Sequence, residues 1–146
     1  MIKRVIVGID FSESSRLALA RARAWAEFVG VPLQAVHVLQ PPAPMLPEAQ
    51  IALPDPSWLS AMEAHALEHL KQWLADIPTA SPQVLWGSPA EELVALADRD
   101  CMLVVAQVGH SGLERLLFGT TAARVVKHAP CDVLVVRADR HPRPEA

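Results

Sequence analysis

The sequence predicts an α/β domain: a single doubly wound, open parallel sheet of five strands with helices on both faces. Strand-like and helix-like segments alternate along the whole chain, which is the pattern of a parallel sheet with crossover helices. The strand-like runs are continuously apolar, as in strands that are buried on both faces. At 146 residues and 51% hydrophobic composition, the chain is long enough for one domain with a substantial core.

The first strand is predicted at residues 4–9, a β-branched run of strand length. A helix follows from Ser14, with Ser12 or Ser14 as its N-cap, and it ends at Gly30. Apolar residues recur every three to four positions along this helix, at Leu17, Ala20, Ala24 and Phe28.

The second strand is predicted at residues 33–39. It contains His37, whose apolar surroundings favour a core histidine with a hydrogen-bond partner. Six of the 18 residues from 40 to 57 are prolines, so this segment can hold neither a long helix nor a central strand. It is either a flexible flap or an ordered cover over the domain.

The next helix is predicted at residues 57–76, and a short third strand at residues 84–86. The apolar stripe of the helix comprises Leu59, Met62, Ala66, Leu70, Trp73 and Leu74. His65 and His69 are four residues apart on this helix, a spacing that can share a metal ion. No third ligand is nearby in the sequence, so both are expected on a solvated face.

The third helix has a strong start signal, with Ser88 as N-cap and Pro89 at the first helical position. The remaining elements are expected at residues 88–98 (helix), 101–106 (strand), 120–128 (helix) and 132–137 (strand). The domain is predicted to span residues 1–138, and the polar, proline-containing residues 139–146 to form a flexible tail.

Composition and charge exclude several classes of function. The net charge of −3 gives no overall basic footprint for nucleic acid. No apolar stretch reaches the ~18 residues of a transmembrane helix, and the start has no apolar secretion signal, so a cytoplasmic protein is expected. Cys101 and Cys131 are expected to be buried free thiols, since nothing in the sequence indicates a redox pair.

Candidate binding residues follow the first and fourth predicted strands. In doubly wound sheets, ligands bind at the carboxyl ends of the strands, where the strand order reverses. If these two strands are neighbours, Asp10 faces the stretch AQVGHSGLERLLFGTT at residues 106–121. The Asp10 carboxylate can bind ribose hydroxyls or a base edge, or it can form a local Asx-turn or cap.

The stretch from 106 to 121 has residues that are typical of an anion-binding loop. Gly109 and Gly112 can bring bare backbone amides close to an oxyanion. Gly119, Thr120 and Thr121 open a helix, whose N-terminus offers free N–H groups and hydroxyl donors to a phosphate. His110 lies in the same loop, where it either approaches a phosphate or faces solvent.

Three segments together resemble the universal stress protein family over residues 2–138: VIVGIDFSESSRLAL, AVHVL and, most specifically, GLERLLFGTTAARVVKHAPCDVLVVR. The resemblance implies the strand order 3-2-1-4-5 of an adenine nucleotide alpha hydrolase-like fold. The ATP-binding branch carries G-x-x-G, nine residues, then G-[S/T]. Here Gly119 and Thr120 match the final pair, Gly109 matches the second glycine, and Ala106 stands where the first glycine is expected.

By this resemblance, Asp10 contacts the adenosine, the backbone of Val38 contacts the adenine, and the phosphates lie against Gly109, Gly119 and Thr120, with Thr121 as a helper. The implied ligand is ATP or another adenine nucleotide, accompanied by Mg²⁺ or Mn²⁺. If the backbone at Ala106 has a positive φ, the alanine is strained by ~1 kcal/mol or more; otherwise it adds one methyl group.

The resemblance implies a nucleotide-binding stress-response module that has little or no catalytic turnover. A dimeric scaffold that no longer binds nucleotide and a slow ATPase are the alternatives. The family typically forms homodimers through the last strand, here Val133, Leu134, Val135 and Val136. An exposed apolar edge strand of this kind favours pairing with a second chain.

Overall fold

The computed structural model describes residues 1–41, 56–107 and 120–137, and in them five strands form one sheet. The strands are β1 (Arg4–Gly8), β2 (Leu33–Leu39), β3 (Ala80–Trp86), β4 (Cys101–Ala106) and β5 (Asp132–Val136). Their order is β3-β2-β1-β4-β5, and all neighbours are parallel. The predicted fold class and strand order are confirmed, and β1 and β4 are indeed adjacent.

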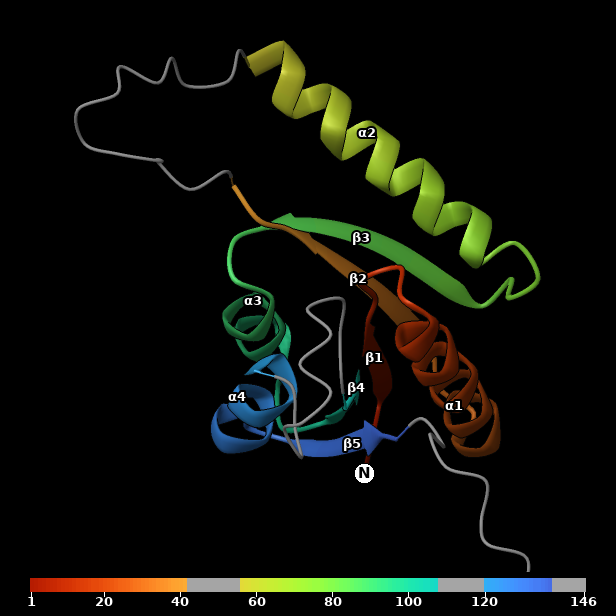
Figure 1. Ribbon diagram of the computed structural model, residues 1–146. Helices are drawn as coiled ribbons and strands as arrows, with labels where there is room; N and C mark the ends of the chain where they lie inside the picture. The colour runs from red at the N-terminus through yellow and green to blue at the C-terminus, as the bar shows by residue number, and fades with distance from the viewer. Residues whose placement is uncertain (42–55, 108–119, 138–146) are drawn as a thin grey trace, which may run out of the picture.

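Two helices cover each face of the sheet. The helices are α1 (Glu13–Val29), α2 (Pro56–Trp73), α3 (Pro89–Leu96) and α4 (Thr120–His128). Helices α1 and α2 lie on one side of the sheet, and α3 and α4 on the other (Figure 1). Successive side chains of β1 point to opposite faces, so Val5 and Val7 join the core beneath α1 while Ile6 joins the core beneath α3 and α4.

Helix α1 begins and ends as predicted, but of its predicted apolar stripe only Leu17 packs against the core, and Ala20, Ala24 and Phe28 are exposed. Ser12 is the N-cap, and Gly30 closes the helix in the left-handed conformation. The residues that pack on the sheet are Ser15, Ala18, Leu19, Ala22 and Ala26. Small residues on this face let the helix lie close to the strands, and the side chain of Phe28 is left 84% exposed.

Strand β3 begins four residues earlier than predicted and contains a proline. Pro82 pairs in register with Ala35 of β2. A proline is tolerated here because β3 is an edge strand. Its nitrogen can lie on the side of the strand that has no neighbour, where no N–H donor is needed. The predicted strand at residues 84–86 therefore covers only the carboxyl-terminal part of β3.

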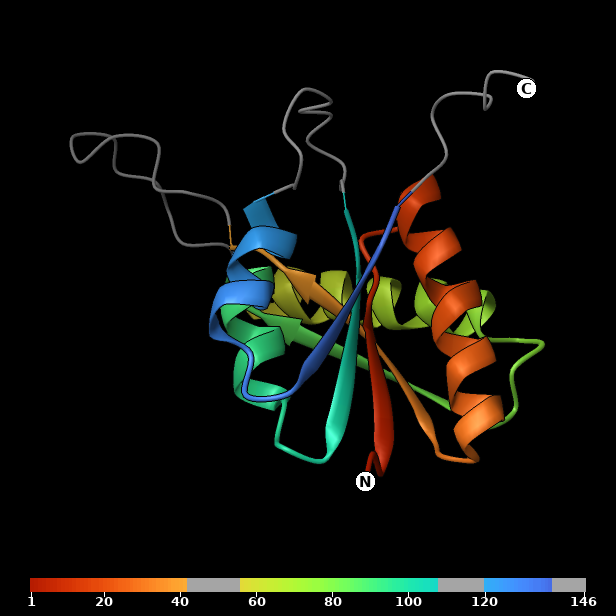
Figure 2. The same ribbon diagram turned by 90° about the horizontal axis from the view of Figure 1, so that it is seen from below.

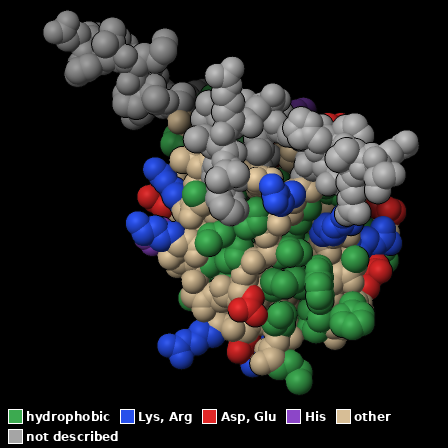
Figure 3. All heavy atoms as spheres, turned by 60° about the horizontal axis from the view of Figure 1, so that its bottom comes forward, with side chains coloured by type: hydrophobic (Ala, Val, Ile, Leu, Met, Phe, Trp, Pro, Cys, Tyr) green, Lys and Arg blue, Asp and Glu red, His purple; other side chains and the backbone are tan. Residues whose placement is uncertain are grey.

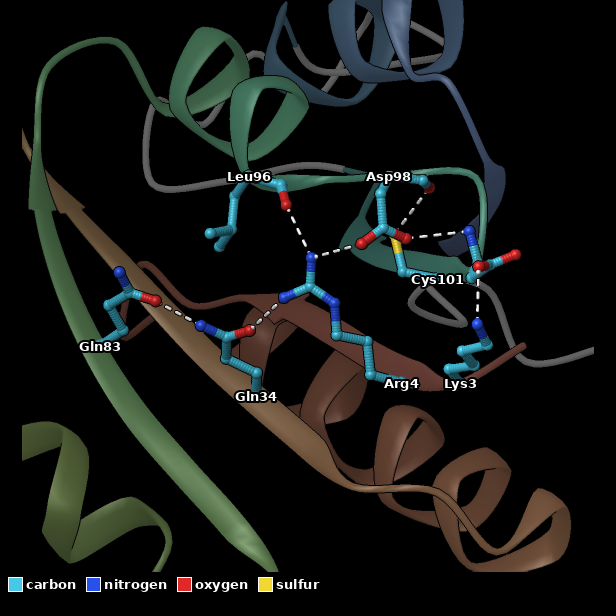
Figure 4. A network of polar contacts seen from close by, with 8 residues as sticks. Lys3, Arg4, Gln34, Gln83, Leu96, Asp98 and Cys101 are labelled. Carbon is cyan, nitrogen blue, oxygen red and sulfur yellow. Dashed lines mark hydrogen bonds and ion pairs between the residues drawn. The ribbon is translucent and has the colours of Figure 1, made fainter. Parts of the chain in front are cut away.

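The amino-terminal edge of the sheet carries a closed polar network (Figure 4). Arg4 donates to the side chain of Gln34 at 2.9 Å, to the carbonyl of Leu96 at 2.8 Å and to Asp98 at 3.0 Å. Gln34 in turn donates to Gln83 on β3. The network joins three neighbouring strands, β1, β2 and β3, to the end of α3.

The Asp98 carboxylate is held ionised by its neighbours at this edge. The backbone N–H of Asp100 donates to it at 2.9 Å, and Arg4 adds a second hydrogen bond. These contacts lower the pKa of Asp98, the backbone hydrogen bond most of all. Both carboxylate oxygens therefore have a defined partner.

Strand β5 is the second edge strand of the sheet. It lies nearest the viewer in Figure 2, between α4 and α1, with no described strand beyond it. Its residues Val133, Leu134 and Val135 remain only partly buried. Hydrophobic side chains gather on the face of the molecule that Figure 3 turns toward the viewer, where the lower edge of Figure 1 comes forward.

The two cysteines lie side by side at the amino-terminal ends of β4 and β5. Cys101 is buried, and Cys131 is partly buried; both are free thiols, as predicted. Burial, helped by a hydrogen bond with Cys101, raises the pKa of the Cys131 thiol to about 12. A thiol with such a pKa stays protonated at neutral pH and is a poor nucleophile.

Candidate functional site

A cavity of about 590 Å³ lies at the carboxyl ends of β1, β2 and β4. Its walls come from residues 8–10, 36–40 and 105–107 and from the first turns of α3 and α4. In Figure 2, β1 runs upward from the labelled N-terminus, so this end of the sheet lies toward the top. The position is the crevice between neighbouring strands β1 and β4 that the sequence predicted as a binding site.

Asp10 lines this cavity and also shapes the turn after β1. Its Oδ1 accepts a hydrogen bond from the backbone N–H of Ser12 at 3.0 Å and another from the Ser12 hydroxyl. The Ser12 hydroxyl in turn accepts from the N–H of Ser15 at 3.1 Å, which caps α1. The Asx-turn that the sequence offered as one alternative is present, and the same carboxylate reaches the cavity.

Phe11 holds this turn in an uncommon backbone conformation. Its φ of 63° makes it the one non-glycine residue with positive φ in the described segments. The ring stacks on His69 of α2, with centroids 4.0 Å apart and planes 10° apart, and meets the edge of Trp73 at 5.3 Å. The expectation of a solvated face is therefore wrong for His69, since this helix face packs on the turn beside Asp10.

Strand β2 contributes the wall that contains Val38 and His37. The Nδ1 atom of His37 lies 2.7 Å from the carbonyl oxygen of Ile9, which confirms the predicted hydrogen-bonded histidine. Val38, predicted as an adenine contact through its backbone, lines the cavity as well. Together they place apolar surface and backbone polar groups on one wall, as in other small-molecule pockets.

Ala106 lies at the end of β4, on the cavity wall. It pairs with Val136, and the N–H of the next residue, Gln107, donates to the Val136 carbonyl at 2.9 Å. Ala106 is not among the positive-φ residues of the described chain. Of the two consequences that the sequence left open, only the added methyl group remains.

Helix α4 begins at the cavity. Thr120 and Thr121, both predicted as phosphate contacts, line it, and so does Arg124 one turn later. Arg124 was not predicted as a site residue because it lies outside the glycine motif. It is four residues after Thr120, so the two side chains share one helix face. The other predicted contacts, Gly109, His110, Gly112 and Gly119, lie outside the described residues.

The start of α3 forms another part of the wall. Ser88 is the N-cap residue, as predicted, but its side chain makes no capping hydrogen bond. Ser88 lines the cavity, next to Pro89 and Ala90. No cluster of three or more His, Cys, Asp or Glu side chains that could hold a metal ion occurs in residues 1–41, 56–107 and 120–137.

Comparison with known proteins identifies the family of this chain. A sequence model described as the universal stress protein family matches residues 1–137. The chain belongs to the universal stress protein family. A relative of that family from Methanocaldococcus jannaschii is 31% identical over 150 residues, which cover 94% of this chain and 83% of the relative.

Solved universal stress proteins share the fold of this chain. The UspA protein from Lactobacillus plantarum superimposes with a TM-score of 0.77 at 25% identity, over 92% of this chain and 97% of that one. A universal stress protein solved in complex with cAMP gives a TM-score of 0.62 at 27% identity, over 92% and 96% of the two chains. In the described part of this universal stress protein, no helix is long and apolar enough to cross a membrane.

Proposed function

We propose that this universal stress protein binds an adenine nucleotide, ATP, in the cavity between β1 and β4 and acts as a nucleotide-responsive module of a cytoplasmic stress response. The observation that carries the proposal is the meeting of Asp10, Val38, Ala106 and Thr120 around one cavity of about 590 Å³. That volume lies within the roughly 300–1,000 Å³ range of small-molecule sites. The cAMP complex of a family member supports an adenine nucleotide as the ligand class.

Each wall has a chemical task in this proposal. The Asp10 carboxylate accepts hydrogen bonds from ribose hydroxyls, while the backbone at Val38 bonds the adenine edge. The end of β4 at Ala106 would lie against the ligand. Thr120 and Thr121 present hydroxyls and the positive end of the α4 dipole to the phosphates. Mg²⁺ or Mn²⁺ would arrive with the phosphates, since Asp10 is the one carboxylate among the described lining residues.

Turnover is proposed to be slow or absent. Two groups in the described wall could act as a base, and both are engaged in local hydrogen bonds. Asp10 accepts from Ser12 through Oδ1, and His37 meets the Ile9 carbonyl through Nδ1. Release of ADP well above that of a heat-inactivated sample would favour the slow ATPase instead.

A second candidate function follows from Ala106. The methyl group occupies space at the strand end where the ATP-binding branch has a glycine, so a dimeric scaffold without nucleotide binding is the rival proposal. Because the backbone at Ala106 is not in the left-handed region, this methyl group is the whole of the departure at that position.

Isothermal titration of the full chain with ATP and Mg²⁺ separates the two candidates. We expect measurable binding, and a loss of at least about tenfold in affinity for Asp10→Ala, because the ribose loses a charged acceptor. Asp76→Ala is the matched control: it removes a carboxylate that pairs with Arg23 at the surface, far from the lining residues. No binding at millimolar ATP would leave the scaffold function.

The homodimer is proposed to form through β5. The open strand edge and the partly buried Val133, Leu134 and Val135 would gain backbone and apolar partners from a second copy. Light scattering during size-exclusion chromatography should give twice the chain mass of 15.9 kDa. A monomeric mass at about 100 μM, where weak dimers with micromolar Kd would form, would contradict this proposal.

A further inference from the structure

The cavity carries opposite charges on different walls. Among the described residues that line it, Asp10 is the one acidic side chain and Arg124 is the one lysine or arginine. Asp10 follows β1, whereas Arg124 lies on α4, one turn after Thr120. A ligand in this cavity can therefore meet the Asp10 carboxylate at one wall and the Arg124 guanidinium at another.

Arg124 differs from the arginines that the fold uses for itself. Arg4 has three hydrogen-bond acceptors, Arg23 pairs with Glu27 and Asp76, and Arg16 lies 4.0 Å over the ring of Trp73. No residue in the described part of the chain forms an ion pair or hydrogen bond with Arg124. Within the described residues, none of its guanidinium donors is therefore used by the fold.

The helix holds Arg124 in a fixed place. Ala122 and Val125 of α4 are fully buried in the core beneath α3 and α4, so the helix cannot turn about its axis. Arg124 is four residues after Thr120 and three after Thr121, which places the three side chains on neighbouring positions of one face. The guanidinium and the two hydroxyls therefore face the same end of the cavity.

We infer that Arg124 recognises the phosphate chain and sets the preference of this site for nucleoside di- and triphosphates over nucleosides and monophosphates. The inference rests on the proposed nucleotide binding and adds its specificity. Asp10 and Val38 address parts of the ligand that adenosine, AMP and ATP share. A guanidinium forms bidentate, charge-assisted hydrogen bonds with phosphate oxygens. ATP and ADP carry more phosphate oxygens and more negative charge than AMP, and adenosine carries no phosphate.

The test is a titration of four ligands, ATP, ADP, AMP and adenosine, into the full chain and its variants at one fixed salt concentration. Arg124→Ala should weaken ATP and ADP binding at least about tenfold, because charge-assisted hydrogen bonds of this kind are lost, and leave adenosine within about twofold. Arg124→Lys should fall between, since a lysine keeps the charge but not the bidentate geometry. Lys127→Ala removes an exposed cation from the same helix outside the cavity lining and should leave all four affinities unchanged.

Two results would overturn the inference. One is an Arg124→Ala variant that binds ATP within about twofold of the parent; the other is an equal loss of adenosine and ATP affinity. Thermal unfolding of each variant, with Arg124→Gln as a second neutral replacement, shows whether a loss reflects the fold. If the parent binds none of the four ligands, the proposed function itself is wrong; if it binds ATP and Arg124→Ala matches it, only the role of Arg124 is wrong.

Discussion

Arg4 lies at the amino-terminal end of the sheet, and Arg124 lies on α4 beside its carboxyl-terminal end. The two arginines differ in their hydrogen-bond partners. At the amino-terminal edge, Arg4 is shared among Gln34, the Leu96 carbonyl and Asp98. At the carboxyl-terminal edge, Arg124 faces a cavity, and the described chain gives it no partner. The same side chain therefore serves stability at one edge and is left available for a ligand at the other.

Other residues follow the same division. The amino-terminal end also has the Cys131 thiol, whose pKa is raised by burial, and a carboxylate with both oxygens engaged. The carboxyl-terminal edge has Phe11 in a strained conformation and a Ser88 hydroxyl that does not cap its helix. Strain and unused polar groups collect where a ligand is proposed to bind, which is a common feature of functional sites.

The largest effect on stability is expected for Arg4, at the amino-terminal end of the sheet. Arg4→Ala removes three hydrogen bonds and leaves the partly buried Gln34 and the Leu96 carbonyl without their donor. We expect a loss of about 2 kcal/mol in the free energy of unfolding by urea, because hydrogen bonds to charged groups contribute about 1.5–3 kcal/mol. Nucleotide affinity should not change. Lys3→Ala is the control: its pair with Asp100 is exposed, with 75% and 50% of the two side chains accessible, so the loss should stay below about 1 kcal/mol.

At the carboxyl-terminal end of the sheet, the conformation of Phe11 gives a paired prediction. Phe11→Ala loses the stack on His69 but keeps a side chain at φ 63°, whereas Phe11→Gly loses the stack and relieves the strain. The glycine variant should therefore be more stable than the alanine variant by about 1 kcal/mol. Urea unfolding of both variants measures the difference. An alanine variant at least as stable as the glycine variant would show that Phe11 is not strained.

The sequence was sufficient for the fold because its local signals agree with one another. The strand runs and the caps at Ser12 and Gly30 indicate the alternating elements, and the family resemblance implies their strand order, which the structure confirms. Helix α1 was harder, since its many alanines fit more than one helical stripe. The choice between the stripe with Phe28 and the one with Ala26 depends on how closely the helix approaches the sheet, and no local pattern encodes that distance.

The site could be predicted only where a residue belongs to a motif or a strand end. Asp10, Val38, Ala106, Thr120 and Thr121 all reach the cavity that the topology predicted. Arg124 was missed because it belongs to no motif, and its place on the cavity wall, with no partner among the described residues, is a property of the tertiary structure. The stack of His69 on Phe11 was missed for the same reason, since it joins segments 58 residues apart in the chain.

The two N-cap serines give a smaller contrast between structural and available hydroxyls. Ser12→Ala should lower the free energy of unfolding by about 1 kcal/mol, because its hydroxyl caps α1 and bonds Asp10. Ser88→Ala should lower it by only a few tenths of a kcal/mol, since that hydroxyl makes no capping bond. Chemical unfolding of the two variants side by side measures the contrast, and equal losses would mean that Ser88 does cap α3.

The last prediction concerns the pH dependence of stability, and the expected effect is absent at neutral pH. The thiol of Cys131 has a pKa of about 12 in the folded chain, mainly through burial, against 9.0 without that environment. Between these values the folded state keeps a proton that the unfolded state has lost, so the free energy of unfolding falls as pH rises above 9. Cys131→Ala removes this thiol. The difference in the free energy of unfolding between parent and variant should be constant from pH 7 to 8.5. By pH 10.5 the parent should have lost stability relative to the variant. Urea unfolding under reducing conditions measures that difference, in which the titration of the lysines cancels. A difference that stays constant up to pH 10.5 would mean that the amino-terminal edge opens to solvent around Cys131 and is not the closed region that the Arg4 network indicates.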